Sequence, residues 1–103
     1  DSAALNVAVE IRQSNDEAET AAWVAEAASA FDAVIINPSA FTVAEGPLIG
    51  ALRDSRIPVI EVHASNPAAR GVRSNITPVS QGAVCGFGYD GYRVALTGLL
   101  GVH

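Results

Sequence analysis

The sequence contains no lysine and only one cysteine, Cys85, among its 103 residues. Without lysine, the chain can form neither a Schiff base through a side-chain amine nor a Walker-type phosphate site, which excludes two large classes of enzyme. A lone cysteine cannot make an internal disulfide or a multi-thiolate metal site, so a reducing cytoplasm is the expected location. Because the sequence also has only two histidines, we expect no metal centre.

Positive charge and long apolar runs are also scarce. Six arginines are outweighed by eleven acidic residues, which gives a net charge of −5, and no basic cluster is interleaved with aromatic residues. A nucleic-acid partner is therefore not expected. No apolar run approaches the roughly 20 residues that span a bilayer, and no basic and apolar leader opens the sequence, so we expect a soluble protein without a membrane partner.

Apolar residues are plentiful enough for one core. Half of the residues are hydrophobic, which supports a single domain over residues 1–103 and leaves no room for two. The sequence begins at Asp1 rather than at a methionine and runs almost directly into a strand-like segment. We therefore expect a processed or partial chain.

Strand and helix patterns alternate along the sequence. Residues 5–11 alternate apolar with smaller or polar side chains, which is the period of a strand. Short apolar runs rich in β-branched residues, typical of strands covered on both faces, recur further along. The predicted strands span 5–11, 33–36, 57–62 and 83–85, and the predicted helices span 17–30, 44–54 and 89–100. This order predicts an α/β fold, a flavodoxin-like three-layer domain with a parallel sheet.

The helix predicted at 17–30 has clear local signals. Residues 14–16 offer capping side chains, and two glutamates follow in the first turn. Its apolar stripe is predicted to consist of Thr20, Trp23, Val24, Ala27 and Phe31. Two glycines and a proline interrupt the pattern of the helix predicted at 44–54.

Polar residues follow two of the predicted buried strands. Asn37 comes directly after strand 33–36, and Glu61 and His63 lie at the end of strand 57–62. Because the carboxyl ends of parallel strands meet at one edge of a sheet, these three residues should form the polar centre of one small-molecule site. Glu61 and His63 point to the same face of an extended strand, so the carboxylate could orient the imidazole and favour its charged form, as a general acid requires. The alternative is that Glu61 is a capping group and His63 a structural hydrogen-bonding residue.

A loop predicted over 63–78 supplies further candidate ligands. Arg70 and Arg73 are three residues apart and could clamp a carboxylate, although exposed loop arginines commonly serve only solubility. Ser65 and Asn66 could donate hydrogen bonds to an anion, or could be ordinary turn residues.

Other conspicuous residues are expected to have structural roles. Gly86-Phe87-Gly88 matches only part of a dinucleotide-binding fingerprint, so it predicts a tight turn between strand and helix. Cys85 is expected to pack as a small hydrophobic residue. Tyr89 and Tyr92 are predicted to be packing or interface aromatics, and His103 to be inert.

Four longer blocks are more specific. They are Arg12-Gln13-Ser14-Asn15, Ile35-Ile36-Asn37-Pro38-Ser39-Ala40-Phe41-Thr42, Pro58-Val59-Ile60-Glu61-Val62-His63-Ala64-Ser65-Asn66 and Cys85-Gly86-Phe87-Gly88. In this order and at this spacing they resemble the type II 3-dehydroquinate dehydratases, and the resemblance covers nearly the whole chain.

The resemblance implies a flavodoxin-like subunit, usually assembled as a dodecamer of trimers, that removes water from 3-dehydroquinate through an enolate without metal or cofactor. It implies that His63 protonates the departing hydroxyl, with Glu61 behind it, and that Asn37 holds the substrate. The backbone amides of Ala64 and Ser65 would bind the substrate's carboxylate.

The chain departs from the family on one side of the implied site. The family has Asn-Pro-Gly-Ala-Tyr-Thr-His where this chain has residues 37–43, so Val43 replaces a histidine that contacts the ring hydroxyls of the substrate. Gly50 occupies the position at which the family has an aspartate that reaches into the neighbouring subunit's site. The loop after Arg70 is shortened, which leaves Arg73 as the match to the family's second arginine. The family's first strand and its mobile lid, which carries the tyrosine base, have no counterpart in the sequence.

The sequence leaves two functions open. The first is a lyase of the shikimate pathway, a type II dehydroquinase or a close relative. The second is a non-catalytic or repurposed paralogue that binds a small carboxylate or serves as an assembly subunit.

Overall fold

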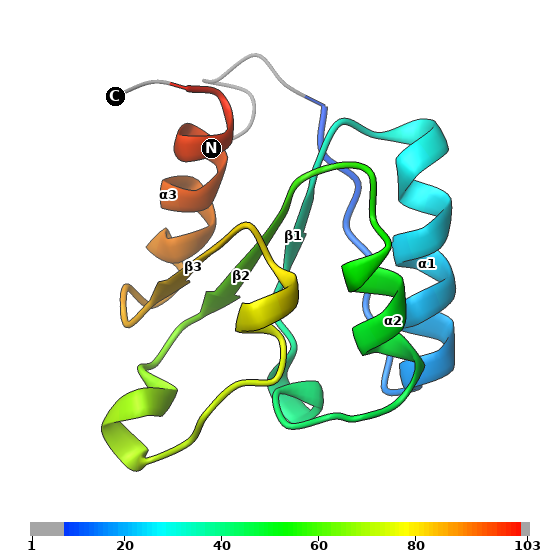
Figure 1. Cartoon of the computed structure of the whole chain (residues 1–103). Helices are drawn as coiled ribbons and strands as arrows, with labels where there is room; N and C mark the ends of the chain where they lie inside the picture. The colour runs from blue at the N-terminus through cyan, green and yellow to red at the C-terminus, as the bar shows by residue number, and fades with distance from the viewer. Residues whose placement is uncertain (1–7, 102–103) are drawn as a thin grey trace.

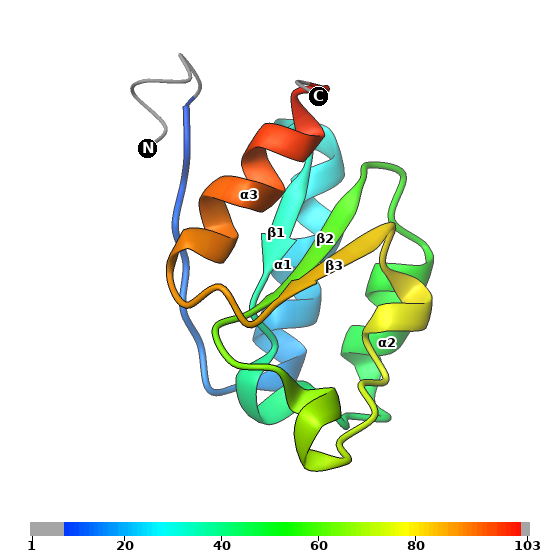
Figure 2. The ribbon, with the colours of Figure 1, turned by 90° about the vertical axis from the view of Figure 1, so that its left-hand side faces the viewer.

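The computed structural model describes residues 8–101, which form a three-layer α/β fold around a parallel sheet. The sheet has the order β1-β2-β3, with β1 at Val34–Ile36, β2 at Val59–His63 and β3 at Gly82–Cys85. Helices α1 (Glu17–Ala30) and α2 (Pro47–Arg53) cover one face, and α3 (Asp90–Leu99) covers the other (Figures 1 and 2). The predicted alternation of strand and helix is therefore confirmed.

Short 3₁₀ helices occupy the loops that follow β1 and β2. They span Ser39–Phe41, Pro67–Arg70 and Thr77–Val79. The second lies within the loop predicted over 63–78 and the third begins at its end. The loop is therefore more regular than its sequence suggested, because a proline near the start of each 3₁₀ helix favours a helical turn.

Helix α1 has the bounds that its capping residues predict. The Asp16 carboxylate accepts hydrogen bonds from the backbone amides of Ala18 at 2.9 Å and Glu19 at 3.4 Å, which satisfies donors that have no partner within the helix. The predicted apolar stripe is partly wrong. The buried positions are Ala21, Val24 and Ala27, whereas Thr20 and Trp23 are half-buried and Phe31 lies past the last turn, 38% exposed. Ala21 and Val24 belong to the core that α1 shares with α2 and the sheet.

Helix α2 is shorter than the predicted span of 44–54, since Pro47 can only begin a helix. Its start is stabilised from α1, where the Glu17 carboxylate accepts a hydrogen bond from the Leu48 amide at 3.1 Å. A Cβ atom on Gly46 would come within 2.6 Å of that carboxylate, so a larger residue would require the Glu17 side chain to move. Helix α3, at 90–99, is one residue shorter at each end than predicted.

The main hydrophobic core lies between α1, α2 and the sheet. Its fully or nearly fully buried members are Ala21, Val24, Ile36, Leu48, Leu52, Val59 and Ile76. Burial of each of the larger side chains contributes roughly 1.5–3 kcal/mol relative to exposure. Ile76 comes from the loop after β2, so the core fixes a segment that also approaches the carboxyl ends of the strands.

The strand predicted at 5–11 is wrong in its described part, and residues 5–7, like His103, lie outside the described residues. Ala8 to Ile11 form no ladder with the described part of the sheet, and Val9 and Ile11 are 53% and 80% exposed. An alternating pattern becomes a strand only where a neighbouring strand and a covered face exist. Arg12 instead holds this segment against α1 by lying 5.5 Å from the Trp23 ring centroid.

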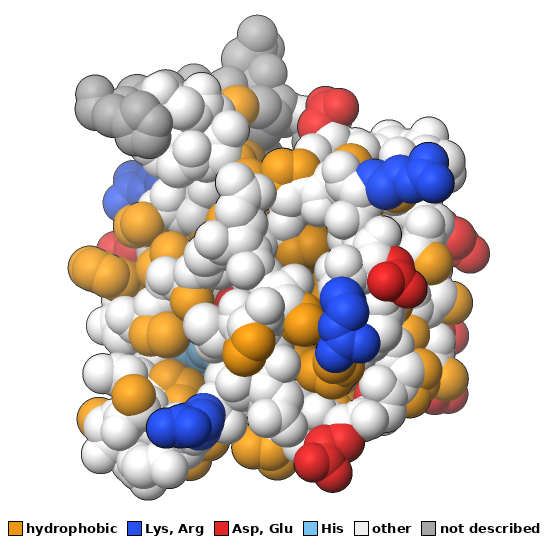
Figure 3. Space-filling model, in the orientation of Figure 1, with side chains coloured by type: hydrophobic (Ala, Val, Ile, Leu, Met, Phe, Trp, Pro, Cys, Tyr) orange, Lys and Arg blue, Asp and Glu red, His pale blue; other side chains and the backbone are white. Residues whose placement is uncertain are grey.

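Large hydrophobic side chains remain exposed near α3. Phe87, Tyr89 and Val94 are 60%, 87% and 44% exposed. Figure 3 shows hydrophobic side chains at the surface on the left of this view, where α3 lies in Figure 1. No helix within residues 8–101 combines the length and the apolar character needed to cross a membrane.

Candidate active site

The polar residues predicted to form a site lie at one edge of the sheet. In the parallel register Ile36 pairs with Glu61, and His63 pairs with Cys85, so β1, β2 and β3 all end on the same side. Asn37 directly follows β1. The carboxyl ends of strands in an open α/β sheet are the usual position for a ligand.

Glu61 and His63 form a buried pair on one face of β2. His63 Nε2 lies 2.6 Å from Glu61 Oε2, and the two residues are 7% and 0% exposed. The period of two along a strand places both side chains on the same face, as the sequence predicted. Since Nε2 faces the carboxylate, Nδ1 is the ring nitrogen left to exchange a proton with a ligand.

Two hydroxyl groups complete the surroundings of Glu61. Ser74 Oγ donates to Glu61 Oε2 at 2.5 Å, and Thr77 Oγ1 donates to Oε1. A carboxylate removed from water needs such donors to offset its lost hydration. Neither residue is predicted from the sequence as part of the site, because both lie in a loop without a motif. The only available signal was that a buried glutamate must find hydrogen-bond donors somewhere in the chain.

Asn37 is oriented by two hydrogen bonds. Its Oδ1 accepts from the Ser39 amide at 3.1 Å, and its Nδ2 donates to the Tyr92 hydroxyl at 3.1 Å. Tyr92, predicted only as a packing or interface aromatic, therefore connects α3 to the site. Ser39 has a φ of +47°, a backbone conformation that favours glycine.

The turn that follows His63 is fixed by the loop after β3. The Gly86 amide donates to the carbonyls of His63 at 3.2 Å and Ser65 at 3.0 Å, and the Gly88 amide donates to the Ala64 carbonyl at 2.9 Å. The predicted tight turn at 86–88 is confirmed, with φ of +87° at Gly86 and +58° at Gly88. Within residues 8–101 the amides of Ala64 and Ser65 donate to no group, so both can bind an acceptor.

The two loop arginines differ in their surroundings. Arg70 Nη1 donates to Ser65 Oγ at 3.0 Å, which places a positive charge beside the free amides. Arg73 is exposed, makes no ion pair with the described residues, and lies directly before Ser74 in the chain. The structure therefore connects Arg70 to the turn but does not join the two arginines into a clamp.

Cys85 is placed opposite His63 in the sheet but is a poor nucleophile. Burial raises the pKa of the Cys85 thiol, and the negative charge of Glu61 acts in the same direction. A raised pKa keeps the thiol protonated at neutral pH, and the thiolate is the reactive form. Within residues 8–101 no group of three or more His, Cys, Asp or Glu side chains is arranged to hold a metal ion.

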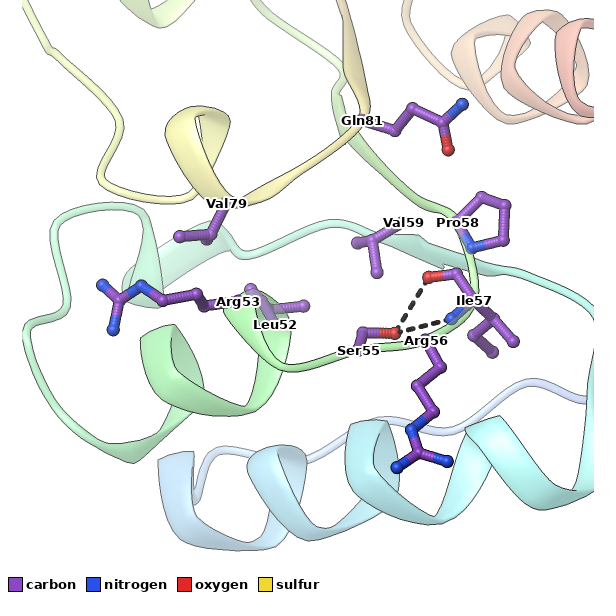
Figure 4. A pocket seen from close by; sticks show the side chains of 9 residues that line it. All are labelled: Leu52, Arg53, Ser55, Arg56, Ile57, Pro58, Val59, Val79 and Gln81. Carbon is purple, nitrogen blue, oxygen red and sulfur yellow. Dashed lines mark hydrogen bonds between the residues drawn. The ribbon is translucent and has the colours of Figure 1, made fainter.

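Two hollows of the described surface lie away from this site. A cavity of about 310 Å³ opens at the amino ends of the strands, lined by residues that include Arg53, Arg56 and Gln81. Figure 4 shows these three polar side chains pointing in different directions, so they do not converge on one ligand. A second hollow of about 450 Å³ lies between α1 and α2. Neither contains a predicted site residue, and convergent polar groups identify a site better than volume does.

The chain matches known proteins over nearly its whole length. The family model described as dehydroquinase class II matches residues 1–100. A 3-dehydroquinate dehydratase of Hyphomonas neptunium is 43% identical over 98 residues, which are 92% of this chain and 67% of that protein. One of Brucella canis is 36% identical over 101 residues, which are 95% of this chain and 64% of that protein. The chain thus spans about two thirds of the length of these curated relatives.

A solved structure agrees with the sequence matches. The crystal structure of type II dehydroquinase from Propionibacterium acnes superimposes with a TM-score of 0.87 at 35% identity, over 94% of this chain and 69% of that one. Together with the parallel three-layer arrangement, this likeness confirms the predicted flavodoxin-like fold.

Proposed function

Because the chain belongs to the class II dehydroquinase family, we propose that it acts as a 3-dehydroquinate dehydratase, a lyase of the shikimate pathway. The reaction removes water from 3-dehydroquinate through an enolate, and it uses no metal or cofactor. The observation that supports this proposal most is the buried Glu61 and His63 pair, followed by two backbone amides that donate to no group within residues 8–101.

His63 is proposed as the general acid for the departing hydroxyl. Its Nε2 is held by Glu61 at 2.6 Å, so the proton would leave from Nδ1. Glu61 holds the ring in one orientation, and its negative charge stabilises the imidazolium that delivers the proton. Only 7% of His63 is exposed, which restricts competition from water at the reacting nitrogen.

The turn after β2 is proposed to bind the substrate's carboxylate. The amides of Ala64 and Ser65 donate to no group of the described residues, and Arg70 Nη1 donates to Ser65 Oγ at 3.0 Å. Together they offer directed hydrogen bonds and a positive charge to a planar anion. Arg73 would add a second positive charge, and Asn37 would bind a substrate oxygen through its amide.

The side of the site that would face the ring hydroxyls of the substrate differs from that of the family. Val43 is 59% exposed, and a Cβ atom on Gly50 would meet nothing within 4 Å, so neither position offers a polar group to the ring hydroxyls. We expect weaker recognition of the hydroxyls than of the carboxylate. In the family a lid tyrosine removes the proton next to the ketone, and residues 8–101 contain no match to it.

The protein is further proposed to be a cytoplasmic homo-oligomer built from trimers, with a dodecamer as the complete assembly. The exposed hydrophobic side chains near α3 support association, because a chain of this length buries its apolar surface inefficiently alone. Sedimentation of the native protein tests this proposal, and a monomeric mass would contradict it.

The enzyme proposal is tested by the absorbance of the enone formed when 3-dehydroquinate is added to the native protein. We expect turnover, and we expect His63→Ala to reduce it by roughly 10²- to 10⁴-fold, the usual contribution of a positioned acid. Ser80→Ala, which removes only a hydroxyl donor to the Ile76 carbonyl, is the control and should retain activity. Turnover by His63→Ala equal to that of the wild type would contradict the role of His63.

A second measurement addresses the carboxylate site independently. Quinate or citrate should shift the backbone amide NMR signals of residues 64 and 65. An inactive wild type that still shows these shifts would support a carboxylate-binding paralogue. Unmoved amide signals would show that the proposed carboxylate pocket is wrong.

A further inference from the structure

We propose that Ser74 and Thr77 are positioning residues that hold the Glu61 carboxylate in the orientation required by His63. The proposal rests on the function proposed above, in which His63 is the acid. Neither Ser74 nor Thr77 is proposed to touch the substrate, so both residues would act through Glu61.

The hydrogen-bond directions around Ser74 are determined by its backbone neighbour. The Ile76 amide donates to Ser74 Oγ at 3.0 Å, so the serine oxygen is an acceptor for that bond. Its own proton is then free to point at Glu61 Oε2, 2.5 Å away. Ser74 is therefore a donor to the carboxylate in this arrangement, and not an acceptor from it.

Both oxygens of the Glu61 carboxylate have hydrogen-bond partners. Oε1 accepts from Thr77, and Oε2 accepts from Ser74 and lies 2.6 Å from His63 Nε2. Because both oxygens are occupied, rotation of the carboxylate away from His63 would break a bond to Ser74 or Thr77.

The segment that carries the two hydroxyls is itself anchored on both sides. The Asn75 amide donates to the Thr42 carbonyl at 2.8 Å, and Asn75 Nδ2 donates to the Ala44 carbonyl at 3.1 Å. The next residue, Ile76, is 0% exposed and packs in the main core. Residues 74–77 therefore bridge the loop after β1 and the acid on β2, which are the two sides of the proposed site.

This arrangement predicts a separation of kinetic effects. Loss of one hydroxyl leaves the carboxylate-binding turn intact, so substrate affinity should change little. The His63 imidazole, however, would then face a Glu61 carboxylate whose orientation is no longer fixed, so proton transfer in the transition state should be slower. We expect kcat to fall by roughly 10-fold, the order associated with one hydrogen bond to a charged group, while KM stays within about 2-fold.

The test compares Thr77→Val, which removes the hydroxyl at nearly constant volume, with Thr77→Ser, which keeps it. The readouts on the native protein are the pH titration of the His63 imidazole by NMR, without substrate, and kcat and KM for 3-dehydroquinate. We expect Thr77→Val to shift the titration and lower kcat, and Thr77→Ser to restore both. Ser80→Ala, in the same loop, should change neither.

Ser74→Ala gives an independent measurement, because it removes the bond to Oε2 and leaves Thr77 in place. A His63 titration identical to the wild type in both Thr77→Val and Ser74→Ala would overturn the proposal. If the wild type does not turn over 3-dehydroquinate but the titration shifts in these variants, the proposed function fails while the positioning of His63 is supported. The two failures are therefore distinguishable.

Discussion

Gly91 is a point of close approach between α3 and the sheet, and replacing it with alanine should destabilise the protein. A Cβ atom at Gly91 would lie 3.1 Å from Val62 Cγ1 and 3.6 Å from Val84 Cγ1. Val62 is 0% exposed, so its side chain cannot move outward into solvent. The added methyl group therefore requires Val62, on the strand that carries Glu61 and His63, or helix α3 to shift by a few tenths of an ångström.

Two opposing terms decide the size of the effect. Overpacking of a buried site costs roughly 1–3 kcal/mol, whereas alanine in place of glycine within a helix gains at most about 1 kcal/mol. Gly91 is the second residue of α3, where that gain is smaller. We expect Gly91→Ala to lower the free energy of unfolding by about 1 kcal/mol, and hence the melting temperature by about 4–8 °C.

The matched control is Gly98→Ala in the same helix. A Cβ atom at Gly98 would meet nothing within 4 Å, so this variant gains helix propensity without a steric cost. Urea and thermal unfolding followed by circular dichroism should show opposite signs for the two variants. The double variant Gly91→Ala with Val62→Ala should be more stable, by at least about 0.5 kcal/mol, than the sum of the two single effects on the free energy of unfolding. Equal stabilisation by Gly91→Ala and Gly98→Ala would refute the close contact of α3 with the sheet.

Three further outcomes are expected from local features. Asp16→Ala should lower the free energy of unfolding by about 1 kcal/mol in urea titrations because α1 loses its capping carboxylate, and an unchanged midpoint would contradict that role. Ser39→Gly should raise the free energy of unfolding by up to about 1 kcal/mol, since glycine adopts the φ of +47° without strain. A loss of stability would show that the serine side chain contributes more than the backbone strain costs. The rate of Cys85 alkylation by iodoacetamide should rise with pH around a midpoint above that of free cysteine, because the raised pKa keeps the thiol protonated to higher pH. A midpoint at or below the ordinary value would contradict the effect of burial and of Glu61 on this pKa.

The sequence alone predicted the elements whose signals are local. The capping side chain of Asp16 and the acidic first turn placed helix 17–30 correctly, because a helix start depends on residues within one turn. Apolar runs located the three strands to within about two residues. The side-chain period of two put Glu61 and His63 on one strand face, and the structure places them 2.6 Å apart.

Features that join distant segments required the tertiary structure. Ser74 and Thr77 are 13 and 16 residues from Glu61, and Tyr92 is 55 residues from Asn37, so no periodic pattern relates these partners. The segment at 8–11 has a strand-like alternation, yet strand pairing depends on a neighbouring edge that the pattern cannot reveal. Local sequence thus determined which residues could form helices, strands and an acid pair, whereas packing decided which donors reach the buried carboxylate, because that choice depends on contacts between loops far apart in the chain.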